Sequence, residues 1–474
     1  MLISLTDNQY SPIAWSNTCG HEKCPEEVRK TLLRFDDVSL EELQSESFPG
    51  GRFLVFPTDS VKADLGDKDY IFSLTDKESD KPGFKTGNVM GFFCLGEDVR
   101  VKISSRFDNA GKDYFLHYML QKVCNVAYTP RTESGEDPLY DFLYQLFPYY
   151  LNEALAQGVF RAYVTREYND ANVRGPIDVA RHIKFNIPFN GKIAYHTREY
   201  TTDNAITQLI RHTIEYIRSL QYGKTVLENS ENKSLRDNVM AIEMATPTYS
   251  RNDRLNIIHR NARPVTHPYY TAYEPLRKLC LAILTNQKLS YGEDSENMIA
   301  GILFDGASLW EEYLNIVMRE DERIGRRLLH PNNRTGFGRQ YLFNGSTGDI
   351  FPDFLLDIDP EFDDVMTAGQ VFDAKYRTKA LDGDVYKQML SYMFRFDSKI
   401  GKLMYPVIDY DSRNGKNGKT VLPLRRDNNV VLEAQPFFIP KYSEETKFES
   451  FAEDMEKAEA EFLKNLQNDD VKKQ

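Results

Sequence analysis

Two short apolar runs that each carry a carboxylate constrain the fold of this chain more than any other feature. The first run contains Pro352-Asp353, and the second contains Asp373-Ala374-Lys375. Side chains two residues apart on a β-strand share a face, so Asp373 and Lys375 are predicted to point the same way. A carboxylate in a sheet carries a large desolvation cost unless it binds a metal or a cation. The two runs therefore predict neighbouring strands whose carboxylates share an ion.

The length and composition predict a large protein outside the membrane. A chain of 474 residues is expected to form two or three domains. No apolar run approaches the roughly 20 residues that a membrane span requires. The N-terminus lacks the basic start and the apolar core of a secretory signal. We therefore expect a cytoplasmic protein with no membrane partner.

The charge is acidic overall but basic in places. A net charge of −12 argues against a protein that coats nucleic acid non-specifically, because such binding needs many cationic contacts with phosphates. Arginines gather in two basic clusters, and either cluster could be a solvated face. For the second cluster, we give equal weight to contact with phosphate, because this cluster directly precedes Asp353. The first cluster comprises Arg251, Arg254, Arg260 and Arg263, and the second Arg319, Arg323, Arg326, Arg327, Arg334 and Arg339.

The cysteines do not predict a disulfide scaffold. There are five, at positions 19, 24, 94, 124 and 280, which is an odd number without regular spacing. Cys19 and Cys24, with His21 between them, could hold a metal only by recruiting ligands from elsewhere. Reduced, structurally ordinary thiols are the favoured interpretation.

The pattern along the chain predicts a multidomain α+β protein in four segments. Residues 1–112 contain short β-type runs between turns and are expected to form a β-rich module. Residues 113–298 show helical periodicity and are the candidate partner-docking region. Residues 299–440 alternate helices and strands, which predicts a mixed central sheet flanked by helices. Residues 441–474 are predicted to form an amphipathic helix that packs back on the domain.

Three helices are predicted in the middle segment and in residues 299–440. One spans about 206–217, with Asp203 as its N-cap. A second follows Asp305, and Glu311 lies nearer the edge of its apolar stripe than Glu312 does. A third begins at about Asp384 and carries Gln388 and Tyr392 one turn apart.

The paired carboxylates suit the hydrolysis of a phosphodiester. This reaction needs an activated water and compensation for charge that builds on oxygen. Asp353 and Asp373 supply hard oxygen ligands for magnesium, the carbonyl of Ala374 could add another, and Lys375 could orient the water or stabilise the developing charge. The alternative is a charged edge strand, on which an Asp-X-Lys pattern is common. No serine-hydrolase elbow or phosphate-binding Gly-X-X-X-X-Gly-Lys-Ser/Thr loop is present, so any nucleotide-driven step would need a partner.

These elements resemble the PD-(D/E)XK nucleases, with Pro352-Asp353 as the first half of the motif and Asp373-Ala374-Lys375 as the second. The resemblance narrows to the McrC family through the segment Tyr386-Lys-Gln388-Met-Leu-Ser-Tyr392. The upstream segments Gly158-Val-Phe-Arg-Ala-Tyr and Arg174-Gly-Pro-Ile-Asp178 are similar to that family as well. The match covers roughly residues 140–408.

The resemblance implies an endonuclease of a modification-dependent restriction system. It implies catalytic roles for Asp353, Asp373, Lys375, Glu311 and Gln388. The metal would be Mg²⁺, with Mn²⁺ as a substitute, held by Asp353, Asp373, Ala374 and Glu311. The implied partners are an McrB-like AAA+ GTPase that forms a hexameric ring, and double-stranded, modified DNA.

A second interpretation of the resemblance remains open. The chain could be a non-enzymatic adaptor in which a nuclease-like fold regulates the AAA+ motor. The presence of Asp353, Asp373 and Lys375 favours the nuclease, because an adaptor would be free to lose them. Segments 66–88 and 251–263 are the candidate contacts with the partner.

Overall fold

The computed structural model describes most of the chain and divides it into two compact units. Unit 1 comprises residues 1–135 and 299–474, and unit 2 comprises residues 136–298. The residues described are 2–12, 26–39, 42, 52–56, 70–76, 83–95, 99–108, 110–124, 138–220, 226–227, 233–285, 299–331, 340–343, 347–359, 366–378, 383–408, 419–425 and 427–467. Cys19, His21, Cys24, Arg334 and Arg339 lie outside this set.

Unit 1 contains a five-stranded sheet in the order β1-β7-β6-β10-β3. Its fourth strand comes from a distant part of the chain, because β10 pairs with β6 on one side and with β3 on the other. Gly91 is required on β6: its φ is +142°, and a Cβ there would meet the carbonyl oxygen of Ile302 at 2.1 Å. The strands are β1 (Leu2–Thr6), β3 (Arg52–Phe56), β6 (Val89–Leu95), β7 (Val99–Ser104) and β10 (Ile299–Asp305).

A three-stranded sheet in the order β2-β5-β4 and two helices complete this part of unit 1. Phe72 and Phe84 are fully buried here, with ring centroids 5.1 Å apart. The candidate contact segment 66–88 thus contains two core strands, while residues 66–69 and 77–82 lie outside the described part. The elements are β2 (Tyr10–Pro12), β4 (Phe72–Thr75), β5 (Gly83–Thr86), α2 (Glu26–Leu33) and α4 (Tyr114–Cys124).

The second large sheet of unit 1 is mixed and has the order β11-β14-β15-β16-β18-β17. β14 and β15 are antiparallel, whereas β15, β16 and β18 run parallel to one another. This confirms the predicted mixed sheet. Its strands are β11 (Leu328–Leu329), β14 (Phe354–Asp359), β15 (Thr367–Ala374), β16 (Ile400–Ile408), β17 (Thr420–Pro423) and β18 (Val431–Ile439), and β12 (Gln340–Phe343) pairs separately with β13 (Thr347–Ile350).

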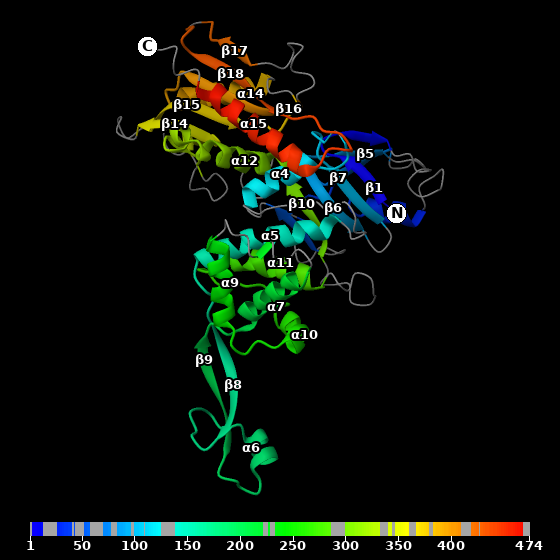
Figure 1. Ribbon diagram of the computed structural model, residues 1–474, viewed down its shortest axis with the longest axis vertical. Helices are drawn as coiled ribbons and strands as arrows, with labels where there is room; N and C mark the ends of the chain where they lie inside the picture. Colours follow the sequence, from blue (N-terminus) through cyan, green and yellow to red (C-terminus); the bar gives the residue numbers. More distant parts are fainter. Residues whose placement is uncertain are drawn as a thin grey trace. The chain divides into compact units, whose positions relative to one another are not determined.

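Helices cover both faces of this sheet, as Figure 1 shows. The first face packs against α14 (Gly383–Arg395), whose Met389 lies in one apolar cluster with Val371 and Leu403. On the opposite face, Phe437 contacts Trp310 of α12 (Gly306–Glu320) and Phe462 of α15 (Phe448–Gln467), at 5.5 and 5.2 Å between ring centroids. The helix α15 therefore packs back on its domain, as predicted. The short helix α13 (Glu322–Gly325) follows α12.

Unit 2 is a helical bundle with a β-hairpin. Figure 1 shows β8 (Ala162–Asp170) and β9 (Ile193–Thr201) as a long ribbon that leaves the helices and carries α6 (Val179–Asn186) at its far end. The helices of the bundle are α5 (Pro138–Ala156), α7 (Ala205–Ser219), α9 (Lys233–Ala245), η2 (Arg251–Asp253), α10 (Arg254–Arg260) and α11 (Tyr273–Thr285).

The segment Arg174-Gly-Pro-Ile-Asp178 lies beside β9 in this hairpin. The amide of Asp178 donates to Ala194, and a Cβ on Gly175 would meet the carbonyl oxygen of His196 at 2.1 Å. Asp178 then caps α6 by accepting from the amide of Arg181 at 3.0 Å. The segment therefore folds the end of the hairpin.

Several sequence expectations differ from this architecture. Residues 299–305 belong to the N-terminal sheet, and α4 belongs to unit 1 and not to the middle segment. The N-cap of α7 is Asn204 and not Asp203, because Asn204 accepts from the amides of Ile206 and Thr207. Of the first basic cluster, Arg251 lies in η2, and Arg254 and Arg260 lie in α10. Among the helices of the described ranges, none combines the length and hydropathy needed to cross a bilayer.

Candidate functional site

The antiparallel pairing of β14 and β15 brings the two predicted carboxylates together. Phe354 is paired with Phe372 in the antiparallel register, so Asp353 and Asp373 lie opposite each other at the next position. The amide of Ala374 donates to Asp353 Oδ2 at 2.7 Å. Asp353 is 8% exposed and Asp373 is 1% exposed. Two acidic side chains therefore lie buried at one end of the central sheet.

Lys375 joins this pair directly after β15 ends. Its backbone amide donates to the carbonyl of Met404 at 2.8 Å, which holds it in line with β16. Its Nζ lies 2.7 Å from Asp373 Oδ2. The ammonium thus lies on the same side as the Asp373 carboxylate, as the alternation of a strand requires.

The electrostatics of the site disfavour two free carboxylates. Burial raises the pKa of Asp353 well above its usual value, and the neighbouring charges of Glu311 and Asp373 raise it further. Burial alone would lower the pKa of Lys375, but the charges of Asp373 and Asp353 outweigh this effect and raise it. The site therefore favours a bound cation, with Lys375 already supplying one positive charge.

The side chains of Glu311 and Glu312, both on α12, lie close to the ring of His330. The His330 Nε2 lies 3.6 Å from Glu311 Oε1 and 3.7 Å from Glu312 Oε1. Of these two glutamates, only Glu311 is among the charges that raise the pKa of Asp353. The geometry thus places Glu311 within electrostatic reach of the carboxylate pair.

His330 is a site residue that the sequence analysis missed. Its Nδ1 lies 2.7 Å from the backbone carbonyl of Asp353, and its ring stacks on Phe354 at 4.8 Å. It follows β11, a two-residue strand that pairs with β14. A single histidine after so short a strand gives no local pattern from which its position could be predicted.

Gln388 lies on α14 and its side chain is engaged on its own helix. The Gln388 Nε2 donates to the hydroxyl of Tyr392 at 2.7 Å. The predicted stacking of these two residues, one helical turn apart, is therefore present. Within the described ranges, no hydrogen bond joins Gln388 to Asp353 or Asp373, so its catalytic role remains a prediction.

The donor set fits a magnesium ion. Mg²⁺ is usually held in proteins by one or two carboxylates and keeps several waters. Asp373 Oδ2 is buried, and the Lys375 ammonium lies 2.7 Å from it. No group of three or more His, Cys, Asp or Glu side chains that could hold a metal is found in the described part of the chain. The fit therefore rests on Asp353 and Asp373, and the ligand roles of Glu311 and the Ala374 carbonyl remain predictions.

The second arginine cluster is largely engaged by other side chains. Arg327 pairs with Asp357, Arg326 Nη2 lies 3.8 Å from Glu322, and Arg319 Nε donates to Asn315 at 2.8 Å. All three arginines are exposed. Solvated ion pairs account for these contacts, and binding of phosphate there remains a prediction.

A second structural feature that sequence reasoning missed lies directly after Lys375. The hydroxyl of Tyr376 is 2.8 Å from that of Ser105, and the Arg106 guanidinium lies 5.0 Å from the centre of the Tyr376 ring. Arg106 in turn pairs with the buried Asp7. These residues come from the first hundred or so positions, so the N-terminal module supports the strand end that carries Asp373 and Lys375.

Similarity to one solved structure supports this fold. A chain of the refined half-complex from a tetradecameric assembly of Thermococcus gammatolerans McrB AAA+ hexamers with bound McrC aligns with a TM-score of 0.51 at 15% identity. The alignment covers 99% of this chain and 100% of that chain. A chain of the cryo-EM structure of the Thermococcus gammatolerans McrBC complex aligns with a TM-score of 0.32 at 14% identity, over 68% of this chain and 89% of that one.

Comparison with protein families establishes the relationship of the sequence. No curated protein matches the chain. The family model described as "McrBC 5-methylcytosine restriction system component" matches residues 84–406, which include both carboxylates of the site. The match confirms the family that the motifs predict, and the chain belongs to the McrBC family of restriction system components.

Proposed function

We propose that this chain is the Mg²⁺-dependent endodeoxyribonuclease subunit of an McrBC-like restriction system. The observation that carries the proposal is the buried pair Asp353 and Asp373, with Lys375 Nζ 2.7 Å from Asp373. Asp353 and Asp373 would hold the ion, with Glu311 beside them. When bound, the ion would supply an activated water and charge compensation at the phosphate.

The protein residues have separate roles in this proposal. Lys375 stabilises negative charge that develops on the phosphate, because its ammonium is held beside the carboxylates. Glu311 supplies further negative charge from α12 and favours a bound cation. His330 holds the backbone of Asp353 and thereby fixes the first carboxylate.

The partner in this proposal is an McrB-like AAA+ GTPase ring. The similar solved structure is part of an assembly of McrB AAA+ hexamers with bound McrC. The end of the β8–β9 hairpin supports docking of a protein, because large apolar side chains are exposed there and contiguous exposed apolar surface marks interaction sites. These side chains are Val173, Ile177, Val179, Ile183, Phe185, Ile187 and Phe189, which are 37–67% exposed.

The second candidate function is a non-enzymatic adaptor. The exposed apolar end of the β8–β9 hairpin would serve an adaptor as well as a nuclease, because it concerns docking and not cleavage. The buried carboxylate pair favours the nuclease, because an adaptor gains nothing from two acids whose burial raises the pKa of Asp353.

One experiment separates the two functions. DNA with and without 5-methylcytosine is incubated with Mg²⁺ and the full chain, with and without the AAA+ partner and its nucleotide. The nuclease is supported if DNA is cut by the wild type and left intact by the Asp373→Ala variant. Cleavage that persists in the variant contradicts the site. Stimulated nucleotide hydrolysis without cleavage under every condition supports the adaptor.

A further inference from the structure

A buried arginine, Arg106, joins three segments of unit 1 that lie far apart in the chain. Its Nε donates to Asp7 Oδ2 at 2.9 Å, and its Nη2 donates to Asn88 Oδ1 at 2.7 Å. Its guanidinium also lies 5.0 Å from the centre of the Tyr376 ring. The side chain of Arg106 is only 5% exposed. These contacts link the residue that follows β1, the residue that precedes β6 and the residue that follows Lys375.

The contacts of Arg106 need both the charge and the shape of a guanidinium group. A positive charge is needed because Asp7 is fully buried, and a buried carboxylate without a cation is strongly destabilising. The planar fork of arginine can donate in two directions and rest on an aromatic ring, whereas the ammonium of lysine is a compact point charge. Arg106→Lys therefore keeps a charge near Asp7 and removes the group that contacts Asn88 and Tyr376 together.

Tyr376 connects Arg106 to the proposed catalytic lysine. Tyr376 is 3% exposed, and its hydroxyl lies 2.8 Å from that of Ser105, which directly precedes Arg106. The amide of the preceding residue, Lys375, donates to the carbonyl of Met404 at 2.8 Å. The backbone at Lys375 is thus fixed between a strand of the central sheet and a side chain that Arg106 contacts.

The same cluster reaches the start of α12, the helix that carries Glu311. The amide of Gly306, the first residue of α12, donates to the carbonyl of Asn88 at 2.9 Å. A Cβ on Gly306 would lie 2.7 Å from the Tyr376 ring, so the helix begins in close contact with this ring. A displacement of Tyr376 would therefore disturb the support of both Lys375 and Glu311.

We infer that Arg106 is a positioning residue of the proposed nuclease site. It holds Tyr376 and Asn88, and through them it sets the places of Lys375 and Glu311. This inference rests on the proposed function, because an effect on catalysis requires that the site cuts DNA. The effect of Arg106 on the structure does not depend on cleavage and is measured separately.

Hydrogen exchange of the full chain, without an AAA+ partner and followed by mass spectrometry, measures the structural effect. We expect the amides of residues 374–377 to exchange at least about fivefold faster in Arg106→Lys than in the wild type, because this segment can open without breaking the guanidinium contacts. The amides of β18 are the internal reference and should exchange at the wild-type rate. An unchanged rate at residues 374–377 overturns the inference.

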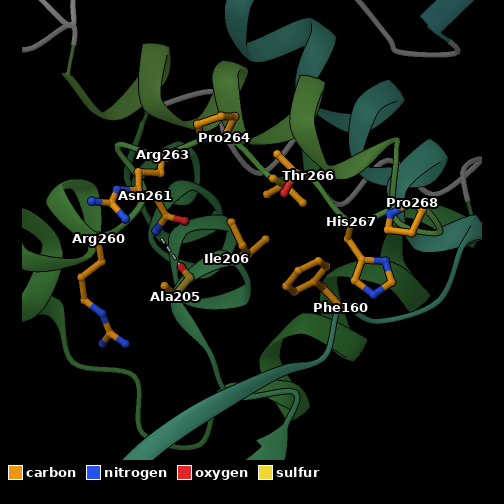
Figure 2. A pocket seen from close by; sticks show the side chains of 11 residues that line it. Phe160, Ala205, Ile206, Arg260, Asn261, Arg263, Pro264, Thr266, His267 and Pro268 are labelled. Atoms are coloured by element: carbon orange, nitrogen blue, oxygen red, sulfur yellow. Dashed lines mark hydrogen bonds between the residues drawn. The ribbon is translucent and has the colours of Figure 1, made fainter.

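Two control variants separate this effect from the substitution itself and from a general loss of stability. Arg263→Lys makes the same substitution at an exposed arginine that lines a pocket of unit 2, as Figure 2 shows. Val101→Ala removes part of a fully buried side chain from the core of the N-terminal sheet. Both variants should leave the exchange of residues 374–377 within about twofold of the wild type. An equal rise in Val101→Ala and Arg106→Lys contradicts a positioning role.

Single-turnover cleavage of DNA, at saturating AAA+ partner, measures the catalytic effect. We expect Arg106→Lys to cut about tenfold more slowly at saturating Mg²⁺, because small displacements of a positioned group have effects of at least this size. Half-maximal cleavage should also need more Mg²⁺, because Glu311 favours the bound cation in the proposed site. Val101→Ala should change the rate by less than about twofold.

A double-mutant cycle tests whether Arg106 acts through Tyr376. In the Tyr376→Leu background, Arg106→Lys should change the cleavage rate by less than about twofold, because residues that act through one contact are not additive. A further tenfold loss in this background would show that Arg106 acts by another route and would overturn the inference.

The two measurements distinguish failure of the inference from failure of the proposed function. If the wild type cuts no DNA under any condition, the proposed function fails, and hydrogen exchange still decides whether Arg106 holds the segment after β15. If the wild type cuts DNA and Arg106→Lys cuts it at the same rate and with the same need for Mg²⁺, the inference fails and the proposed function stands. Circular dichroism of each variant excludes loss of the fold as the cause.

Discussion

The hydroxyl of Tyr376 lies 2.8 Å from the hydroxyl of Ser105, which precedes it by 271 residues. Both residues are buried, and Tyr376 directly follows Lys375. The ring of Tyr376 also packs edge-on against Phe107 at 5.0 Å. A hydrogen bond from the N-terminal module thus fixes the backbone next to the proposed catalytic ammonium.

The Tyr376→Phe variant tests this relationship. We expect DNA cleavage to fall by about ten- to a hundredfold, because small displacements of a positioned group cost this much. The free energy of unfolding should fall by only about 1 kcal/mol, the usual net value of one hydrogen bond. Tyr405→Phe is the matched control, because Tyr405 is a buried tyrosine of β16. An equal loss of cleavage in both variants would show that the Ser105 contact has no particular role.

Lys375→Met should lower cleavage by about 10²–10³-fold and leave the fold intact. The substitution keeps the length and apolar stem of the side chain but removes the ammonium that lies beside Asp373. Cleavage is measured on a labelled DNA substrate under saturating Mg²⁺. Lys387→Met is the control, because that lysine is exposed and pairs only with Asp384 in the described structure. Full activity in Lys375→Met would remove this residue from the mechanism.

Two substitutions at His330 separate the contact of its Nδ1 from the contacts of its Nε2. His330→Asn can keep a nitrogen donor near the carbonyl of Asp353, now 2.7 Å from Nδ1, whereas His330→Phe cannot. We expect the phenylalanine variant to lose about tenfold in cleavage and the asparagine variant to retain most of it. If both lose activity equally, the contact of Nε2 with Glu311 and Glu312 carries the effect instead.

The exposed apolar end of the β8–β9 hairpin should be required for the partner and not for the fold. The double variant Ile187→Ser/Phe189→Ser removes two side chains that are 64% and 67% exposed. We expect weaker stimulation of nucleotide hydrolysis in the AAA+ partner, by at least about tenfold, at an unchanged melting temperature. Met244→Ser, which alters an apolar side chain of the same unit that is 77% exposed, should have no effect. Normal stimulation by the double variant would place the docking surface elsewhere.

His212 should make unit 2 sensitive to acid. Burial, with a smaller effect from Arg254, lowers the pKa of His212 to about 4. Neither ring nitrogen has a hydrogen-bond partner within the described residues. Because the unfolded chain takes up this proton near its ordinary pKa of about 6.5, stability should be lost as the pH falls from about 6.5 to about 4.

The His212→Leu variant should show a smaller loss over the same pH range. Urea unfolding at several pH values, followed by a signal assigned to unit 2, measures the difference. The slope of stability against pH must become shallower in the variant. An identical slope would mean that His212 does not report on acid unfolding.

The sequence predicts the carboxylate pair because the relevant physics is local. The alternation of a strand places Asp373 and Lys375 on one side, and burial of the two apolar runs makes their pairing favourable. The apolar stripes of α12 and α15 can likewise be predicted, because apolar residues recur there with the 3.6-residue period of a helix. These are the elements in which the expected and observed positions agree.

The sequence does not predict strands with polar side chains on both faces, and it does not predict contacts between distant segments. The β8–β9 hairpin has polar side chains on both faces, so it lacks the alternation by which strands are recognised. Asn204 caps α7 in place of Asp203 because its amide can also donate to the carbonyl of Phe160 at 3.0 Å, which a carboxylate cannot do. The positions of His330 and Ser105 follow from pairing between distant strands.

Because β10 belongs to the N-terminal sheet, this sheet cannot be completed until residues 299–305 have been synthesised. Strand β3 pairs only with β10 in the described structure, and β10 also completes the edge of β6. During synthesis, residues 52–56 leave the ribosome long before residues 299–305 exist. The edge of β6 therefore stays unpaired during the synthesis of unit 2, and unit 2 can fold before the first sheet is complete. A chain truncated before residue 299 would lack both the central sheet and the strand that completes the first one.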